Sequence, residues 1–94
     1  MNDQDLVRRL RQLRRSVVML ETELRNHHLD AELIQVIDNQ MGTIALDERC
    51  AGLRDLVDAL RESTLTPRSE LMRDAVRACE KLKDGIEELV GRLG

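Results

Sequence analysis

Histidine and cysteine, two of the residue types that most often perform chemistry, each occur only twice in this 94-residue chain. His27 and His28 are adjacent, and neighbouring residues of a helix point about 100° apart, so the two rings cannot easily bind one ion. His28 and Glu32 have the i,i+4 spacing of two zinc ligands, but zinc would need a third ligand from elsewhere. The simpler interpretation is favourable charge at the C-terminal end of a helix. We expect no metal site.

Cys50 and Cys79 lack the CxxC spacing and partner histidines of redox or metal motifs. Both fall on apolar positions of helical patterns, where a free cysteine behaves as a small hydrophobic residue. A nucleophilic serine would need a nearby histidine, and a phosphate-binding loop would need clustered glycines. Neither pattern is present, and the five glycines are dispersed at positions 42, 52, 85, 91 and 94. We expect two buried reduced thiols, no cofactor and no enzymatic activity.

Five arginines are concentrated between residues 8 and 15. Arg8, Arg11 and Arg15 share one stripe of a predicted helix, and Arg9 and Arg14 flank its apolar seam. Three interpretations stay open: a solvated helix face, a binding face for an acidic protein surface, and a grip on the phosphate backbone of a nucleic acid.

Composition and charge limit the classes of function. The chain is 41% hydrophobic and 35% charged, has no aromatic residue and has a net charge of −3, which argues against non-specific coating of nucleic acid. Residues 1–28 carry a charge of +2, residues 29–64 carry −5, and residues 65–94 are neutral. No apolar run approaches the roughly 18 residues that span a membrane, and the N-terminal residues are acidic rather than basic. We therefore expect a cytoplasmic protein that does not enter membranes.

Heptad spacing predicts two long terminal helices, over residues 3–27 and 67–93. Thr66 and Pro67 have the residue types of an N-cap and a first helical position. Gly85 lies within the last helix, where it suggests a close helix approach or an early end. The seam of the first helix consists of Leu6, Leu10, Leu13, Val17, Leu20 and Leu24. The seam of the last helix consists of Met72, Ala75, Cys79, Leu82, Ile86, Leu89 and Leu93.

Two shorter helices are predicted between them, over residues 30–41 and 44–62. Asp30 has the residue type of an N-cap, and Gly42 fits the C-terminal end of the helix that follows it. The next segment repeats the heptad spacing at Leu46, Cys50, Leu53, Val57 and Leu60.

Residues 41–83 also resemble the ribbon-helix-helix family of DNA-binding proteins. Residues 43–48 are similar to its strand and first helix start, and residues 68–77 (Arg-Ser-Glu-Leu-Met-Arg-Asp-Ala-Val-Arg) are similar to its second helix. In that family two strands pair across a dimer and enter the DNA major groove. The resemblance implies that Met41, Thr43 and Ala45 face DNA, whereas the heptad pattern places the same region at the start of a third helix.

These patterns together predict one all-α domain, residues 1–94: a bundle of three or four helices with coiled-coil-like terminal helices, completed by oligomerisation. A chain this short buries only about two-thirds of its surface by itself, and two short helices cover too little of the terminal seams. A homodimer or a partner helix would cover the rest, through the first-helix seam and Leu82, Ile86, Leu89 and Leu93. The expected function is a small protein-binding module of a bacterial type (adaptor, chaperone or inhibitor) that uses these seams and the arginines. The alternative is a dimeric ribbon-helix-helix regulator with an N-terminal oligomerisation helix.

Overall fold

Four α-helices make up nearly all of the part of the chain that the structure describes. A computed structural model describes residues 2–64 and 69–93, with side chains for residues 2–64 and 73–93. Within these residues there is no strand, which confirms the all-α prediction. The helices are α1 (Asp3–Arg25), α2 (Ala31–Ile44), α3 (Ala51–Thr64) and α4 (Ser69–Leu93), with a short 3-10 helix, η1 (Glu48–Cys50), before α3.

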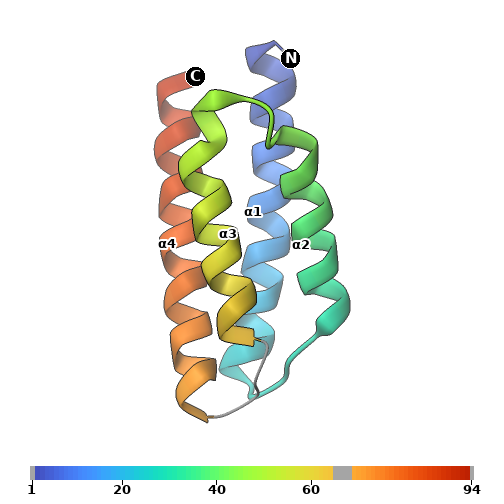
Figure 1. The fold of residues 1–94 in the computed structure, drawn as a ribbon, viewed down its shortest axis with the longest axis vertical. Helices are drawn as coiled ribbons and strands as arrows, with labels where there is room; N and C mark the ends of the chain where they lie inside the picture. Colours follow the sequence, from blue (N-terminus) through green and yellow to red (C-terminus); the bar gives the residue numbers. More distant parts are fainter. Residues whose placement is uncertain (1, 65–68, 94) are drawn as a thin grey trace.

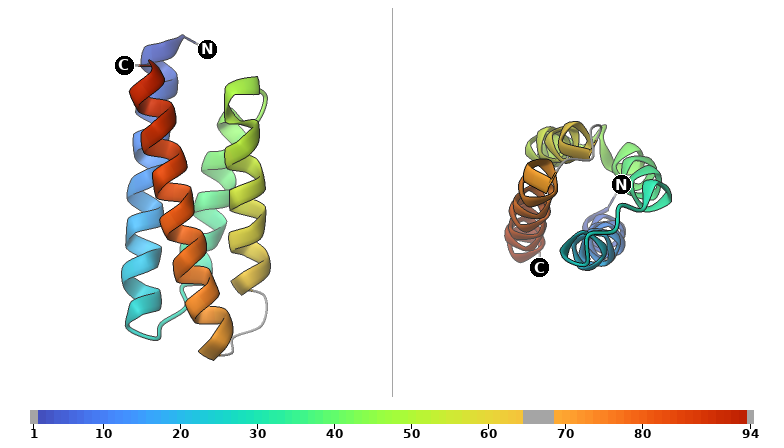
Figure 2. Two further views of the ribbon diagram at one scale, coloured as in Figure 1. Left: turned by 90° about the vertical axis from the view of Figure 1, so that its left-hand side faces the viewer. Right: turned by 90° about the horizontal axis from the view of Figure 1, so that it is seen from below.

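The helices form an antiparallel bundle of about 40 × 20 × 18 Å, in which α1 and α3 run one way and α2 and α4 the other (Figure 1). The most extensive contacts join α1 to α4 and α3 to α4, whereas α2 packs mainly on α1 and only lightly on α3. Seen along the bundle axis, α1 and α3 therefore occupy opposite corners (Figure 2). The outer faces of these two helices point in opposite directions.

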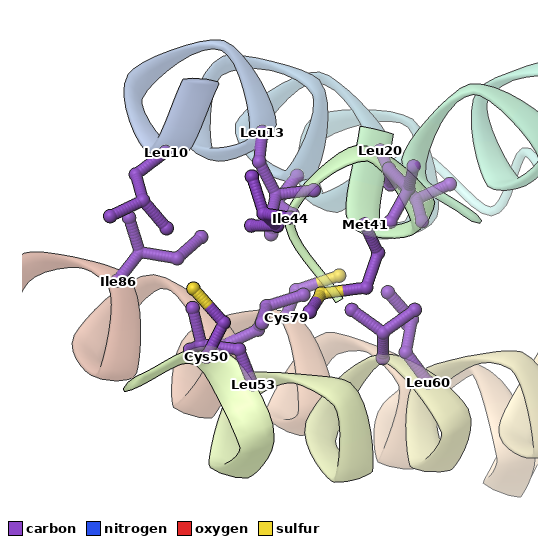
Figure 3. Close-up of a cluster of buried hydrophobic side chains, with 14 of the residues drawn as sticks. Leu10, Leu13, Leu20, Met41, Ile44, Cys50, Leu53, Leu60, Cys79 and Ile86 are labelled. Carbon is purple, nitrogen blue, oxygen red and sulfur yellow. The ribbon is translucent and has the colours of Figure 1, made fainter. Parts of the chain in front are cut away.

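The heptad seams meet in the centre of the bundle. All six seam residues of α1 are at most 2% exposed, and the apolar residues of the other three helices close over them (Figure 3). The buried core includes Leu10, Leu13, Leu20, Met41, Ile44, Cys50, Leu53, Leu60, Cys79 and Ile86.

This packing corrects the expectation that the terminal seams form a partner-binding surface. In α4, Leu82 and Ile86 are fully buried, Leu89 is nearly so and Leu93 is half-buried. The prediction underestimated how much apolar surface α2 and α3 can cover. The apolar stripes of these two helices face the same interior and cover the parts of the α1 and α4 seams that those two helices do not cover for each other. The seams of α1 and α4 are the core of one chain.

The first helix ends two residues earlier than its apolar pattern predicts. Asn26 is the C-cap of α1, and His27 has a φ of 58°, the left-handed conformation that commonly follows a helix. The amide of His28 donates to the Glu23 carbonyl at 2.8 Å, and the amide of His27 donates to the Leu24 carbonyl at 3.0 Å. This pair of bonds is a Schellman motif, which closes the helix before the two histidines.

The second helix continues past the predicted end. Asp30 caps it as expected, accepting from the amides of Glu32 and Leu33, but Gly42 lies within the helix rather than at its end. The physical reason is the stripe of Ile37, Met41 and Ile44, whose 4,3 spacing adds another helical turn to the core.

The third helix begins later than predicted. The predicted seam residue Leu46 lies in the turn after α2 and is 99% exposed. Asp47 caps η1 by accepting from the Arg49 amide at 2.9 Å, and Cys50, Leu53, Val57 and Leu60 follow in the core as predicted. Thr66 and Pro67, predicted to begin the fourth helix, lie outside the described residues, as does the side chain of Met72.

Gly85 marks a close approach of α3 and α4, one of the two interpretations of its position. A Cβ atom there would lie 3.0 Å from Leu53 Cδ2 and 3.2 Å from Leu56 Cδ1. The helix continues through it to Leu93.

Candidate functional site

The outer surface of α1 carries three arginines that point away from the core. Arg8, Arg11 and Arg15, here called the arginine face, are exposed and lie on the side of the helix opposite Leu6, Leu13 and the rest of the seam. None of the three has a carboxylate oxygen within 4 Å among the described residues. The predicted stripe therefore exists as a surface with unpaired positive charge.

Two shallow hollows border the arginine face, and both include Arg11 and Arg15. The first, of about 370 Å³, lies on α1 itself and is lined by Gln4, Val7, Arg8, Arg11, Gln12 and Arg15. The second, of about 430 Å³, lies between α1 and α4 and is lined by Arg11, Arg14, Arg15, Val18, Ile86, Glu87 and Val90. The guanidinium groups thus adjoin small apolar areas, which is the mixture that an amphipathic acidic segment would contact.

The two flanking arginines differ from the arginine face. Arg14 Nη2 lies 2.6 Å from Glu87 Oε1, so its charge is used to join α1 to α4. Arg9 is exposed on the other flank, and the carboxylate of Asp5, four residues earlier on the helix, does not lie within 4 Å of it. Glu21 and Arg25, which have the same i,i+4 spacing, do form an ion pair, at 3.2 Å.

A partly buried ion network between α1 and α4 was not predicted from the sequence. Lys83 Nζ contacts a Glu21 oxygen at 2.5 Å, and Arg25 bridges Glu21 to Glu80, at 3.2 and 2.8 Å. Burial by itself would raise the pKa of Glu21, but the hydrogen bonds from Lys83 and Arg25 outweigh it and lower the pKa. This network joins α1 to α4 through paired charges.

Arg49 plays the corresponding role at the other end of the bundle. Its guanidinium contacts Asp47 and Asp3, each at 2.8 Å, and so joins the start of α1 to the turn before η1. Hydrogen bonds from Arg49 lower the pKa of Asp47 to about 2. The charges here are internally paired, unlike those of the arginine face.

The two cysteines are buried, whereas the two histidines are exposed. Cys50 and Cys79 are free and buried, as predicted, and burial raises the pKa of both thiols, that of Cys79 to about 12. His28 Nδ1 contacts Glu23 at 2.5 Å rather than Glu32. In the described part of the chain, no group of three His, Cys, Asp or Glu residues could hold a metal ion.

The residues assigned to DNA by the ribbon-helix-helix resemblance do not share a surface. Met41 is fully buried, Ala45 is half-buried, and the exposed Thr43 donates its hydroxyl to the Gln40 carbonyl within α2. Residues 43 and 44 are the last residues of α2 rather than a strand, because Met41 and Ile44 complete its apolar stripe. The strand that the resemblance requires is absent from residues 41–47.

Comparison with known protein families, with curated proteins and with solved structures finds no match to this chain. None of the described helices combines the length and apolar character needed to cross a membrane.

Proposed function

We propose that this protein is a non-catalytic protein-binding module whose arginine face captures an acidic segment of a partner protein. The observation that carries the proposal is the contrast along α1. Arg14 and Arg25 are paired with carboxylates, whereas Arg8, Arg11 and Arg15 stand exposed in one stripe with no carboxylate partner among the described residues. Guanidinium groups bind carboxylates in bidentate geometry, which makes such a stripe suited to an acidic helix.

Charge elsewhere favours a protein over a nucleic acid as the partner. Residues 29–64, which form α2 and α3, carry a charge of −5, and the whole chain carries −3. A long polyanion that extended beyond α1 would meet this negative surface, whereas a short acidic segment would contact the arginine face alone. The adjoining Val7, Val18 and Val90 favour a segment that also has apolar residues.

The setting we propose is the cytoplasm, and the role is that of an adaptor, chaperone or inhibitor. Two unpaired buried thiols fit a reducing compartment, because secreted domains of this size usually contain disulfides. The seams expected to bind a partner are occupied by the core, so the proposal rests on the arginine face alone.

A binding experiment with a model helix tests the proposal. The probe is a fluorescein-labelled peptide of about 18 residues, with glutamates at i, i+3 and i+7 and leucines beside them, and fluorescence anisotropy gives its affinity. We expect the triple variant Arg8→Gln, Arg11→Gln, Arg15→Gln to bind at least about tenfold more weakly than the wild type. The control variant Arg73→Gln, Arg77→Gln, Lys81→Gln removes the same charge from the exposed surface of α4 and should bind as the wild type does.

Equal weakening by both variants would contradict the proposal, because the peptide would then respond only to net charge. A labelled DNA duplex forms a second arm of the experiment. Binding of the duplex but not of the peptide would overturn the proposal in favour of a nucleic-acid partner.

A further inference from the structure

The outer surface of α3 carries a second charged stripe, of the opposite sign. Asp55, Asp58 and Glu62, here called the acidic face, lie opposite the buried Leu53, Val57 and Leu60 of the same helix. Asp55 and Glu62 are exposed and have no basic partner within 4 Å among the described residues. Among the described residues, Asp58 forms an ion pair only with Arg54, at 3.6 Å, and about half of its side chain remains exposed.

The acidic face and the arginine face have the same spacing. Residues 55, 58 and 62 repeat the separations of three and four residues found at 8, 11 and 15. Separations of three and four residues are those of successive a, d and a positions in a coiled-coil heptad, the positions at which two parallel helices contact each other in layers. Since α1 and α3 run in the same direction in the bundle, two copies of the chain placed side by side present these stripes to each other in parallel (Figure 1).

We infer that a second copy of this chain is an occupant of the arginine face, through the acidic face of its α3. In the matching register Arg8 is opposite the partner's Asp55, Arg11 is opposite the partner's Asp58 and Arg15 is opposite the partner's Glu62. The inference rests on the proposed function, because the same arginine face binds either an acidic partner protein or the second copy.

The side chains that flank the charged layers permit this approach, because Arg14 and Arg61, which the register places at the same level, are each paired with a carboxylate of their own copy. In the same register Gln4 and Gln12 are opposite Ala51 and Ala59, two exposed alanines whose small side chains leave room for the glutamine amides. No bulky apolar side chain of α3 stands between the two stripes.

The bundle geometry prevents the two faces of one copy from meeting. α1 and α3 occupy opposite corners, so each face points away from the other (Figure 2). Glu21 lies beside Lys83, and Leu53 lies close to Gly85, so the arginine face is nearer the end that carries the termini than the acidic face is. Successive copies are therefore staggered by roughly 15 Å along the bundle axis.

A contact of this kind is heterologous, because different surfaces of the two copies meet. Each added copy leaves one arginine face and one acidic face free, so copies join into open chains rather than closed dimers. The ion pairs are exposed to solvent, so the association is weak and sensitive to salt. An acidic partner protein competes with it for the same arginines.

Sedimentation velocity with interference optics tests this inference, because the chain lacks Trp, Tyr and Phe and absorbs little at 280 nm. At about 1 mM protein the wild type should sediment as a concentration-dependent mixture of oligomers in about 20 mM NaCl and as a monomer in about 500 mM NaCl. Two charge-reversal variants, Arg8→Glu, Arg11→Glu, Arg15→Glu and Asp55→Lys, Asp58→Lys, Glu62→Lys, should each be monomeric at low salt. A mixture of the two variants should associate again, because their reversed faces are complementary.

The control variant Glu32→Lys, Asp74→Lys, Asp84→Lys changes the net charge as the acidic-face variant does, at exposed positions elsewhere, and should associate like the wild type. A monomeric wild type at low salt, a control that loses association, or a mixture that stays monomeric would overturn the inference. The acidic peptide also separates this inference from the proposed function. If the wild type binds the peptide through Arg8, Arg11 and Arg15 and yet stays monomeric at low salt, the second copy is excluded and the proposed function stands.

Discussion

Lys83 Nζ lies 2.5 Å from a carboxylate oxygen of Glu21, in a contact that joins α4 to α1 across 62 residues of sequence. Only 9% of the Glu21 side chain is exposed, so this ion pair is the most buried in the described structure. A buried charge is costly when it loses its partner, because the solvation lost on burial is no longer replaced. The energetic importance of the pair is therefore measured best by removing one partner at a time.

Replacing Lys83 by Met should lower the free energy of unfolding by roughly 2 kcal/mol, below the range for fully buried pairs because Arg25 still contacts Glu21. The double variant Glu21→Met, Lys83→Met should be more stable than Lys83→Met alone, because no unpaired carboxylate remains. Urea denaturation followed by circular dichroism at 222 nm measures both. A double variant less stable than the single variant would show that the pair does not act as described.

Acid should weaken the contact at the opposite end of the bundle. The pKa of Asp47 is lowered from 3.8 to about 2 by Arg49, so the folded state holds this proton less tightly than the unfolded state does. The contribution of the ionised Asp47 to the stability of the folded state is therefore present above pH 4 and is lost as the pH falls towards 2. The stability difference between the wild type and Asp47→Asn should therefore shrink between pH 6 and pH 2, as measured by urea denaturation at each pH. A difference that stays constant over this interval would contradict the role given to Asp47.

Replacing His27 by Gly should stabilise the protein by about 0.5–1 kcal/mol. The φ of 58° at His27 is unfavourable for a residue with a Cβ atom and free of strain for glycine. Asn26→Gly is the matched control, since Asn26 has a φ of −94° and gains nothing from glycine. Thermal unfolding should show a higher Tm for His27→Gly and an equal or lower Tm for Asn26→Gly. The reverse order would place the helix end elsewhere.

Enlarging Gly85 should separate α3 from α4. A leucine at this position meets the Leu53 and Leu56 side chains, where even a Cβ atom has only 3.0 and 3.2 Å, and we expect a loss of about 1–3 kcal/mol. At Gly91 an added Cβ has no neighbour within 4 Å, so Gly91→Ala should gain about 0.5–1 kcal/mol from helix propensity. Chemical denaturation of the two variants checks both values. Equal stability for Gly85→Leu and the wild type would mean that the two helices are not held this closely.

Much of the fold follows from the sequence because its apolar residues keep a helical period. The seam from Leu6 to Leu24 and the cap at Asp30 predicted two helices and their buried faces. The turn after α2 did not follow from that period, because Leu46 continues the heptad spacing of the third segment and yet is exposed. Its position depends on the cap formed by Asp47, a local contact that a periodic pattern does not contain.

The candidate site was predictable to a similar extent. The spacing of Arg8, Arg11 and Arg15 identified the stripe, because residues at i, i+3 and i+7 share a helix face. The sequence did not show that Arg14 would be engaged by Glu87, because that contact depends on the antiparallel register of α1 and α4. The excess of unpaired charge on the arginine face is a property of the tertiary structure.

Amide chemical shifts identify the residues of this protein that the acidic peptide contacts. In ¹H–¹⁵N spectra of the wild type titrated with the unlabelled acidic peptide, we expect the largest shifts at α1 residues 4–18 and at the arginine Nε–Hε signals of Arg8, Arg11 and Arg15. Added salt should return these signals to their positions in the free protein, because it screens the charges that hold the peptide. Shifts that concentrate on α3 and α4 instead, or a peptide that binds without moving these arginine signals, would contradict the assignment of the arginine face as the binding surface.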